Sequence, residues 1–367
     1  MRIAFDARPF ERERTGVGRH LEGLIGAWTS AFPGDRFLAL SPRPVLVPPG
    51  LEGTVEVPYG PSGLPGTLWL QTLAMHQARK SGADLFHGSL GIVGVVGAAP
   101  GSRSIPSVAT IHDLTPLLFP EWHSLKNRLG FTPFLGPSVR VARRLIAVSQ
   151  ATRRDLVLHH PAAEAKCRVV LNGFTPLPSQ TEPVPVPSRP YVLFLGTLEP
   201  RKNVSRLVEA MESIWDRRPD FPALVLAGGE GWGLPGLARR LASSRHAGRI
   251  ERTGYVSSER AGSLIRGARL LAYPSLYEGF GLPPLEAMAL GTVVVASSSS
   301  SLPEVVGSAG LLPDPLDVAS IAAAIERAHD DETFRREARE EGLRRAACFT
   351  WERAARETRS VFEEALS

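Results

Sequence analysis

The sequence predicts an α/β protein built from two Rossmann-like, doubly wound domains, each with a parallel sheet. Short runs of aliphatic and β-branched residues alternate with amphipathic stretches of helical length along the whole chain. Its 367 residues exceed the usual size of a single core, which is roughly 100–200 residues. A proline-rich stretch near the middle separates two series of such units.

The first domain is predicted over residues 1–175. Seven runs have strand composition, at 2–6, 36–40, 54–58, 84–87, 107–111, 145–148 and 168–171. The first of them begins at the N-terminus, without the apolar run and cleavage pattern of a signal peptide. No window holds the ~18 apolar residues needed to span a bilayer. We therefore expect a cytoplasmic protein.

A linker is predicted over residues 176–190, because five prolines between 176 and 187 block both helix and central strand. The second domain follows at 191–349, with strands predicted at 191–195, 223–227, 269–273, 292–296 and 310–312. A last helix is expected over 350–367, because Thr350 is a good helix cap and the spacing after it is amphipathic.

Composition narrows the possible partners and cofactors. Cys167 and Cys348 lie far apart without metal-binding spacing, so neither a disulfide framework nor a zinc site is expected. Residues 1–172 hold 19 lysines and arginines against 12 acidic residues, whereas the remainder holds 23 against 25. The first half should therefore meet a lipid surface, a lipid-diphosphate acceptor or a nucleic acid, unless this is an ordinary solvated basic surface.

Ligands of open parallel sheets bind beyond the carboxyl ends of the strands, so the strand-to-helix junctions are the places to search. The junction after 191–195 reads Gly196-Thr-Leu-Glu-Pro-Arg201-Lys202-Asn203. Arg201 and Lys202 are predicted to open the next helix, whose positive end attracts anions. Basic residues oppose the helix dipole there, so the pair indicates a bound diphosphate rather than a solvated basic loop.

The junction after 269–273 reads Tyr273-Pro-Ser-Leu-Tyr-Glu278-Gly279-Phe280-Gly281-Leu282-Pro-Pro-Leu-Glu286. Its glycines let backbone N–H groups approach a ligand, and its two prolines fit the first turn of a helix. Glu286 lies among apolar residues and should be partly buried with a partner. Carboxylates accept hydrogen bonds from sugar and ribose hydroxyls. In the alternative reading, Glu278 caps the helix and Glu286 lies on its surface.

This EGFGLPPLE segment, preceded by GTLEPRKN, closely resembles the large retaining glycosyltransferase family 4. The resemblance spans nearly the whole chain and implies the GT-B fold, two facing Rossmann-like domains with an interdomain cleft. It implies that Glu278 contacts hydroxyls of the donor sugar, that Glu286 holds the nucleotide ribose, and that Arg201 and Lys202 grip the diphosphate. The remaining donor-binding residues of the two junctions are Gly196, Gly279, Phe280, Gly281 and Leu282.

In the first half, Thr15-Gly16-Val17-Gly18-Arg19 is similar to the family's glycine loop, which closes over the diphosphate and acceptor. Gly-x-Gly alone would read as an ordinary tight turn. Beside the other motifs it indicates the glycine loop, so Gly16, Val17 and Gly18 are predicted to bind the donor. Arg8, which follows the first predicted strand, is assigned to the acceptor side.

The stretch from His112 through Phe119-Pro120-Glu121 resembles a subgroup rich in mannosyltransferases, in which the histidine lies near the donor's anomeric centre. Asp113 is assigned to the acceptor side. The alternatives are a structural His112 and an Asp113 that caps the next segment. In the second half, Tyr255 and Val256 resemble the place where backbone groups hold the nucleobase, before a helix that begins near Ser257.

The predicted activity is transfer of a hexose from a nucleoside diphosphate to an acceptor hydroxyl, with retention of anomeric configuration and no enzyme nucleophile. Arg201 and Lys202 would stabilise the departing diphosphate, so removing either should reduce turnover more than folding. No Asp-x-Asp follows a strand, and the resemblance implies catalysis without a metal or other cofactor. The subgroup favours GDP-mannose as donor, followed by UDP-glucose or another UDP-hexose.

The acceptor is expected to be a glycan, a lipid-linked sugar or a small molecule. Residues 125–140 are predicted to form either a patch that faces the inner membrane surface or a helix packed on the sheet. Its apolar and basic members are Leu125, Leu129, Phe131, Phe134, Leu135, Lys126, Arg128 and Arg140.

Two other classes of protein remain open. A nucleotide-sugar epimerase of similar fold would also need two domains and a diphosphate site. A non-catalytic nucleotide or nucleic-acid binder would fit the basic first half. A nucleic-acid partner is not expected, since neither a helix-turn-helix signature nor an interleaved aromatic and basic pattern is present.

Overall fold

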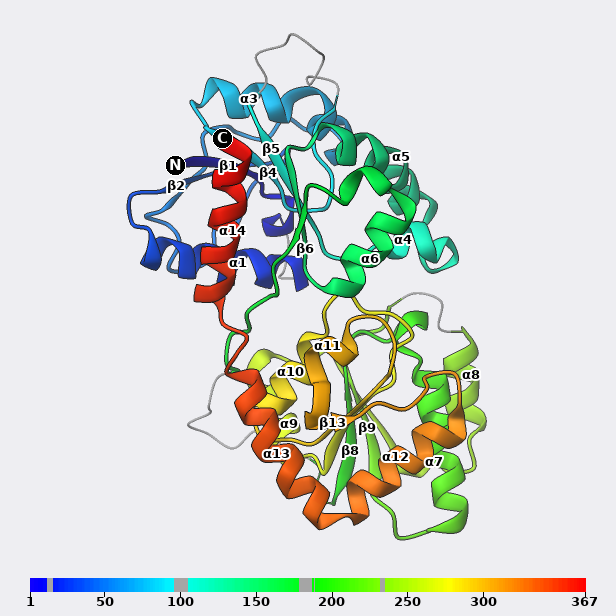
Figure 1. The fold of residues 1–367 in the computed structure, drawn as a ribbon. Coiled ribbons are helices and arrows are strands. Elements are labelled where there is room, and N and C mark those ends of the chain that lie inside the picture. The colour runs from blue at the N-terminus through cyan, green and yellow to red at the C-terminus, as the bar shows by residue number, and fades with distance from the viewer. Residues whose placement is uncertain (12–15, 96–104, 178–186, 188, 232–234) are drawn as a thin grey trace. The chain divides into compact units, whose positions relative to one another are not determined.

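The computed structural model describes residues 1–11, 16–95, 105–177, 187, 189–231 and 235–367. The chain divides into unit 1, Met1–Thr175 with Phe349–Ser367, and unit 2, Pro176–Cys348 (Figure 1). Most of the linker predicted at 176–190 lies outside the described residues.

Unit 1 is built on a parallel sheet with the strand order β3-β2-β1-β4-β5-β6-β7. All strands predicted for the first half are present, with ends that differ by a few residues. They are β1 (Arg2–Asp6), β2 (Arg36–Leu40), β3 (Val55–Glu56), β4 (Leu85–Gly88), β5 (Ser107–Ile111), β6 (Arg144–Ala147) and β7 (Cys167–Val169).

Helices cover both faces of this sheet because successive strand residues point to opposite sides. Ile3 and Phe5 of β1 join one buried cluster, and Ala4 joins the other. The helices of unit 1 are α1 (Gly16–Ala31), α2 (Gly66–Trp69), α3 (Met75–Lys80), α4 (Thr115–Leu118), α5 (Leu125–Val141), α6 (Gln150–His159) and α14 (Trp351–Leu366), with a π-helical turn at Leu70–Ala74. No helix among the described residues is both long and apolar enough to cross a bilayer.

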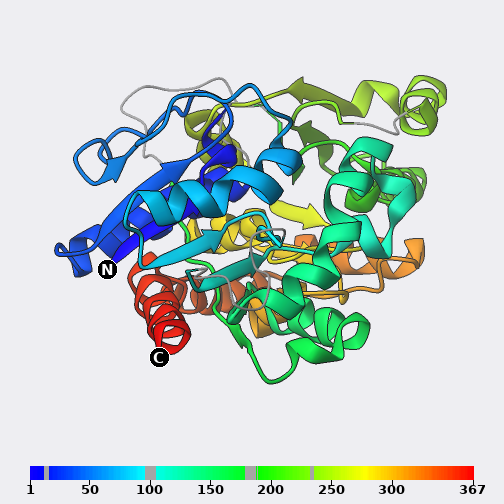
Figure 2. The same cartoon turned by 90° about the horizontal axis from the view of Figure 1, so that it is seen from above.

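The last helix, α14, packs along α1 in unit 1 (Figure 1). Thr350 caps it by accepting a hydrogen bond from the Arg353 amide at 3.2 Å, as predicted. Two glycines let Trp351 pack closely. A Cβ at Gly23 would lie 2.2 Å from its indole, and one at Gly173 would lie 2.4 Å from its backbone nitrogen. In both views the two chain ends lie on the same side of unit 1 (Figure 1 and Figure 2).

The chain leaves unit 1 after Thr175 and returns to it at Phe349, and these two segments lie side by side. The Phe174 amide donates to the Phe349 carbonyl at 3.4 Å, and the Trp351 indole donates to the Thr175 hydroxyl at 3.0 Å. Unit 2 is therefore inserted into unit 1 at a single place.

Unit 2 contains a parallel sheet with the order β10-β9-β8-β11-β12-β13. Its strands are β8 (Tyr191–Leu195), β9 (Ala223–Ala227), β10 (Ile250–Gly254), β11 (Leu270–Tyr273), β12 (Val294–Ala296) and β13 (Gly310–Leu311). Five of them were predicted, whereas β10 was missed. Its sequence, Ile-Glu-Arg-Thr-Gly, is polar and largely exposed at the sheet edge, so it lacks the apolar run of a buried parallel strand.

The helices of unit 2 are α7 (Val204–Arg217), α8 (Pro235–Ser243), α9 (Ser258–Gly267), α10 (Leu282–Ala289), α11 (Leu302–Val306), α12 (Val318–Asp330) and α13 (Glu332–Ala346). Ser257 caps α9, as the predicted start near that residue requires. Pro283 and Pro284 occupy the first turn of α10, also as predicted.

In each sheet the strand order reverses beside the first strand of the unit. β1 lies between β2 and β4, and β8 lies between β9 and β11. Connections leave such a point toward opposite faces, so a crevice opens beyond the carboxyl ends of the two central strands. Three of the sequence-predicted junctions follow β1, β8 and β11, and the one that holds His112 follows β5, the neighbour of β4.

Candidate functional site

The basic pair of unit 2 does not open a helix, contrary to the prediction. Arg201 and Lys202 lie in a short 3-10 turn, Pro200–Lys202, and Asn203 follows with φ of 59° before α7 begins at Val204. The left-handed Asn203 breaks the helix, and its side-chain amide donates to the Pro274 carbonyl at 3.0 Å. The turn is thereby held against the loop that follows β11.

The two junctions of unit 2 meet through a cluster of charged side chains at the β8–β11 crevice. Arg201 Nη1 lies 2.7 Å from Glu278 Oε2, and Lys202 Nζ lies 2.6 Å from Glu278 Oε1. Arg201 Nε also contacts Glu199 Oε1 at 2.6 Å, and Lys202 Nζ donates to the hydroxyl of Tyr273. The helix-capping alternative for Glu278 is therefore wrong, since its carboxylate accepts from both cations.

The cluster is buried except for the partly exposed Arg201, and its formal charges balance, two cations against two carboxylates. Burial by itself raises the pKa of Glu278, but Arg201 and Lys202 outweigh it and lower that pKa to about 2. Burial also lowers the pKa of Lys202, against the attraction of Glu278. Glu278 is thus a fixed carboxylate at neutral pH.

Sequence reasoning missed two members of the cluster, Glu199 and Tyr273. Both stood in the quoted junctions, and an acid two residues before Arg201 was the available signal. The side chain of Lys202 is only 7% exposed, against 24% for Arg201. Losing Lys202 would leave a buried carboxylate short of a partner, so we expect this loss to destabilise unit 2 as well as to reduce turnover.

The glycine loop enters α10 at Gly281, which has φ of 108°. A Cβ there would lie 2.6 Å from Leu302 at the start of α11, so glycine is required both by conformation and by space. The Leu276 amide donates to the Arg201 carbonyl at 2.7 Å, which joins the loop to the basic turn. The segment Gly279-Phe280-Gly281-Leu282 is thus anchored to the charged cluster.

Glu286 lies in the second turn of α10 and is 3% exposed, as its apolar neighbours predicted. The alternative of a surface Glu286 is wrong.

A pocket of about 330 Å³ lies beyond the carboxyl ends of β8, β9 and β10. The predicted nucleobase residues Tyr255 and Val256 follow directly after Gly254 at its rim, and Tyr255 is 78% exposed. The pocket is lined by Leu198, Leu226, Gly228, Glu230, Arg252 and Gly254.

Gly196, predicted to be in the donor site, closes the end of β8. Its amide donates to the Ala227 carbonyl at 2.9 Å. Its own carbonyl oxygen lies where a Cβ of Gly228 would be, at 2.0 Å, so the two loops approach as backbone on backbone. Through this contact the loop that carries the charged cluster packs directly against Gly228 of the pocket.

In unit 1 the predicted residues gather at the β1–β4 crevice and its neighbour β5. The His112 ring follows β5, and its Nε2 lies 3.0 Å from the Ser89 carbonyl oxygen after β4. A carbonyl only accepts, so Nε2 carries the proton. Burial lowers the pKa of His112, so the neutral ring dominates near pH 7. Its ring also packs edge to face on His20 of α1, with centroids 4.8 Å apart.

The other unit 1 residues are placed as follows. Gly16, Val17 and Gly18 form the first turn of α1, directly before His20. Arg8 binds the buried Asp6 with two nitrogens, including Nη2 to Oδ2 at 2.6 Å. Asp113 Oδ1 accepts from the Thr115 amide at 3.0 Å and the Thr115 hydroxyl at 2.6 Å, which is the capping role that the sequence left as an alternative.

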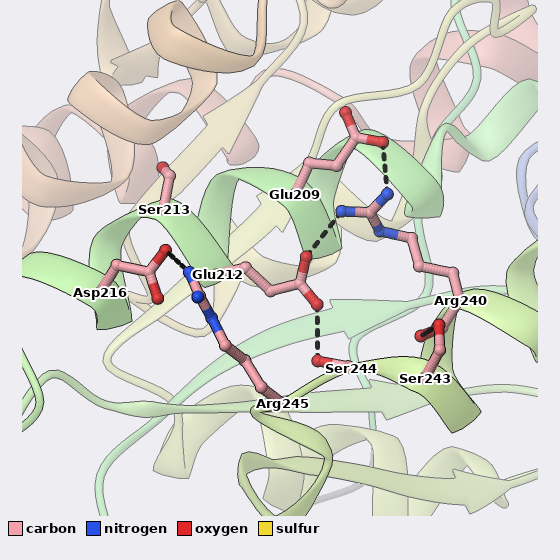
Figure 3. A pocket seen from close by; sticks show the side chains of 8 residues that line it. All are labelled: Glu209, Glu212, Ser213, Asp216, Arg240, Ser243, Ser244 and Arg245. Carbon is pink, nitrogen blue, oxygen red and sulfur yellow. Dashed lines mark hydrogen bonds and ion pairs between the residues drawn. The ribbon is translucent and has the colours of Figure 1, made fainter.

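Another pocket, of about 500 Å³, contains none of the predicted site residues. It lies between α7 and α8 (Figure 3). Its charged groups already pair with one another: Arg240 contacts Glu209 at 2.8 Å and Glu212 at 2.6 Å. Over the described residues, no group of three or more His, Cys, Asp or Glu side chains is arranged to hold a metal ion. Cys167 is buried and Cys348 is exposed, and they form no disulfide.

Comparison with known proteins gives two family matches. Residues 15–176 match glycosyltransferase family 4, and residues 180–345 match the glycosyl transferases group 1. The O-antigen chain mannosyltransferase B of Escherichia coli is 35% identical over 268 residues, which cover 70% of each chain. The MMP alpha-(1->4)-mannosyltransferase of Mycolicibacterium hassiacum is 29% identical over 361 residues, covering 95% of this chain and 79% of that one.

Among solved structures, HepE of Anabaena in complex with UDP-glucose superposes with a TM-score of 0.71 at 20% identity, covering 99% of both chains. This likeness extends over both parallel-sheet units, and such neighbours are glycosyltransferases of the GT-B fold.

Proposed function

Because the chain belongs to glycosyltransferase family 4 and is therefore a glycosyltransferase, we propose that it transfers mannose from GDP-mannose to a hydroxyl of a growing glycan. The observation that carries the proposal is the buried cluster of Arg201, Lys202 and Glu278 at the β8–β11 crevice. Mannosyltransferase relatives support the sugar. UDP-glucose is the second candidate donor.

In this proposal the donor lies across the junctions of unit 2. The diphosphate contacts Arg201 and Lys202, and the glycine loop of residues 279–282 contributes backbone donors. Glu278 accepts from sugar hydroxyls, which suits a carboxylate that stays ionised at a pKa of about 2. Glu286 accepts from the ribose, and the base enters the pocket beside Tyr255 and Val256.

Carboxylates balance the charge of Arg201 and Lys202 before the donor arrives. Long-range electrostatic attraction of the diphosphate is therefore not their main effect. Their value lies in fixed direction: both donors are already oriented when charge develops on the departing diphosphate. Tyr273 and Glu278 restrict the Lys202 ammonium, and Glu199 restricts the Arg201 guanidinium.

His112 would serve the donor sugar from unit 1. With its Nε2 proton engaged by the Ser89 carbonyl, Nδ1 is the nitrogen able to accept a hydrogen bond from a sugar hydroxyl. The first turn of α1, with Gly16, Val17 and Gly18, would approach the diphosphate. Arg8 and Asp113 remain proposals for the acceptor side.

Transfer is proposed to proceed with retention and without a metal ion, the leaving phosphate taking the acceptor's proton. The bond from the sugar's anomeric carbon to the phosphate oxygen breaks, and a bond to the acceptor oxygen forms on the same face. Arg201 and Lys202 would supply the charge stabilisation. In the turnover assay, the rate should be unchanged by EDTA, and NMR of the product should show the donor's anomeric configuration.

Binding of GDP-mannose should raise the melting temperature more than binding of UDP-glucose or UDP-N-acetylglucosamine. A ligand at about 100 times its dissociation constant stabilises the fold by roughly 2.7 kcal/mol. We would measure thermal shifts for these three donors and for GDP and UDP. The same panel with Glu286→Ala should show a reduced shift, because that variant lacks the ribose acceptor.

A larger shift with a uridine donor would favour UDP-glucose as the donor. The absence of a shift with every donor would contradict the proposed donor site. Release of the nucleotide only when an acceptor glycan is present would separate a transferase from an epimerase or a non-catalytic binder.

The acceptor is proposed to be presented at an anionic membrane surface. Leu125 and Leu129 at the start of α5 are 65% and 59% exposed, with exposed Lys126 and Arg128 beside them. Further along α5, Leu135 is fully buried and packs on the sheet. The packed-helix alternative thus describes the later turns, and only the first turns present an apolar and basic surface.

Replacing Leu125 and Leu129 together by serine should weaken binding to phosphatidylglycerol vesicles by about tenfold, because both side chains would insert into the interface. Co-sedimentation measures this binding. Leu316→Ser, at a leucine of unit 2 that is 64% exposed, is the matched control and should bind like the parent protein. Equal losses in both variants, or no binding by the parent, would contradict the membrane proposal.

A further inference from the structure

A run of five serines, Ser297–Ser301, connects β12 to the start of α11. Ser297 and Ser301 are fully buried. The first part of the run supports the beginning of the glycine loop: Ser297 Oγ donates to the Ser275 carbonyl at 2.6 Å, and Ser299 Oγ donates to the Leu276 carbonyl at 2.9 Å. No function was predicted for these serines from the sequence.

The last two serines hold the backbone of Glu278 from both sides. The Glu278 amide donates to Ser300 Oγ at 2.8 Å. Ser301 Oγ donates to the Glu278 carbonyl at 2.9 Å and to the Phe280 carbonyl at 2.8 Å. The backbone groups that flank the Glu278 Cα are therefore fixed by side chains from a different loop.

Ser300 adopts an unusual backbone conformation to make its contact. Its φ is 51°, and Asn203, which joins the basic turn to the same loop, is the other non-glycine residue with positive φ in the described part of the chain. Non-glycine residues rarely adopt this region, and such strain persists where the surrounding structure over-determines it, often at functional sites. Here the conformation directs Ser300 Oγ to the Glu278 amide.

We propose that Ser300 and Ser301 are positioning residues of the transfer reaction, which act by fixing the backbone of Glu278 so that its carboxylate meets the donor sugar in one orientation. The proposal rests on the proposed role of Glu278 toward the donor. Arg201 and Lys202 hold the carboxylate end of the residue, and the serines hold its backbone end. Neither set alone fixes the intervening side-chain torsions.

The first test is Ser300→Gly, because glycine adopts a positive φ without strain and only the short hydroxymethyl side chain is lost. We expect the kcat/KM for GDP release from GDP-mannose, or for UDP release from UDP-glucose if that donor gives the larger thermal shift, to fall by about 10- to 100-fold. The melting temperature should change little. Ser300→Asn tolerates the same backbone and offers a side-chain acceptor, so it should recover part of the rate.

The second test places Ser300→Gly and Ser301→Ala in a Glu278→Gln background. If the serines act through Glu278, each should cost much less there than in the parent protein, because the carboxylate that they position is absent. Thr292→Val is the matched control, because the Thr292 hydroxyl is buried in the same unit and donates to the Ile265 carbonyl of α9 at 2.8 Å. It should leave kcat/KM unchanged.

Equal fold-losses in both backgrounds, or full activity of Ser300→Gly and Ser301→Ala, would overturn the positioning proposal while leaving the donor site intact. Full activity of Glu278→Gln itself would overturn the proposed role of Glu278 and the inference that rests on it. A fall in melting temperature without a loss of rate would assign the serines to folding alone.

Discussion

Replacing Arg201 by alanine should reduce the kcat of sugar transfer by about 100- to 1,000-fold, the usual cost of one preorganised donor at a developing negative charge. Its guanidinium is oriented by Glu199 and Glu278 before the donor arrives. Donor affinity should fall less than kcat, since the charge on the leaving diphosphate increases in the transition state. Steady-state kinetics with varied donor would measure both constants.

Arg240→Ala is the matched control for this experiment. Arg240 also lies in unit 2 and pairs with two carboxylates, Glu209 and Glu212, but it does so in the outer pocket between α7 and α8 (Figure 3). Its loss should leave kcat unchanged. A similar loss of kcat in both variants would mean that removing any paired arginine of unit 2 disturbs the enzyme, and the role of Arg201 in transfer would be abandoned.

Trp351→Ala should destabilise unit 1 by about 3–5 kcal/mol, the range for truncating a large buried aromatic side chain. Trp351 is 8% exposed, and its indole fills the space above Gly23. Loss of its hydrogen bond to the Thr175 hydroxyl adds to the destabilisation that the cavity causes. Urea unfolding, followed by probes specific to each unit, would show an earlier transition for unit 1.

The exposed Arg356 lies on the same helix, and Arg356→Ala should change the unfolding free energy by less than about 0.5 kcal/mol, as surface substitutions usually do. An unchanged unit 1 transition in Trp351→Ala would show that α14 contributes little to that core.

Most predicted strands of the two units, such as β5, β8 and β11, are buried on two faces and therefore read as apolar runs. The strand β10 escaped prediction because its Glu251 and Arg252 face solvent at an edge. The start of α7 was also misplaced by sequence reasoning. Nothing in the letters Arg201-Lys202-Asn203 distinguishes a first helical turn from a 3-10 turn, since the break depends on Asn203 bonding to carbonyls at Pro274 and Pro315, which are distant in sequence.

The candidate site shows the same division. Glu278, Arg201 and Lys202 were identified from local residue types and from the family resemblance. Their mutual pairing, and the contribution of Tyr273, arise only when β8 and β11 become neighbours in the sheet. The contact of Ser300 with Glu278 could not be predicted from the sequence. A run of serines looks like an ordinary loop, and serine gives no sign of a left-handed backbone conformation.

The insertion of unit 2 into unit 1 has a consequence for the order in which the protein is made. Residues 176–348 are translated without interruption, so unit 2 can complete its sheet as it emerges from the ribosome. Unit 1, although its strands are synthesised first, must wait for residues 349–367 before the groove along α1 receives Trp351 and α14. Until α14 is made, Trp28 of α1 lacks the ring of Phe362 on which it packs, with centroids 5.3 Å apart.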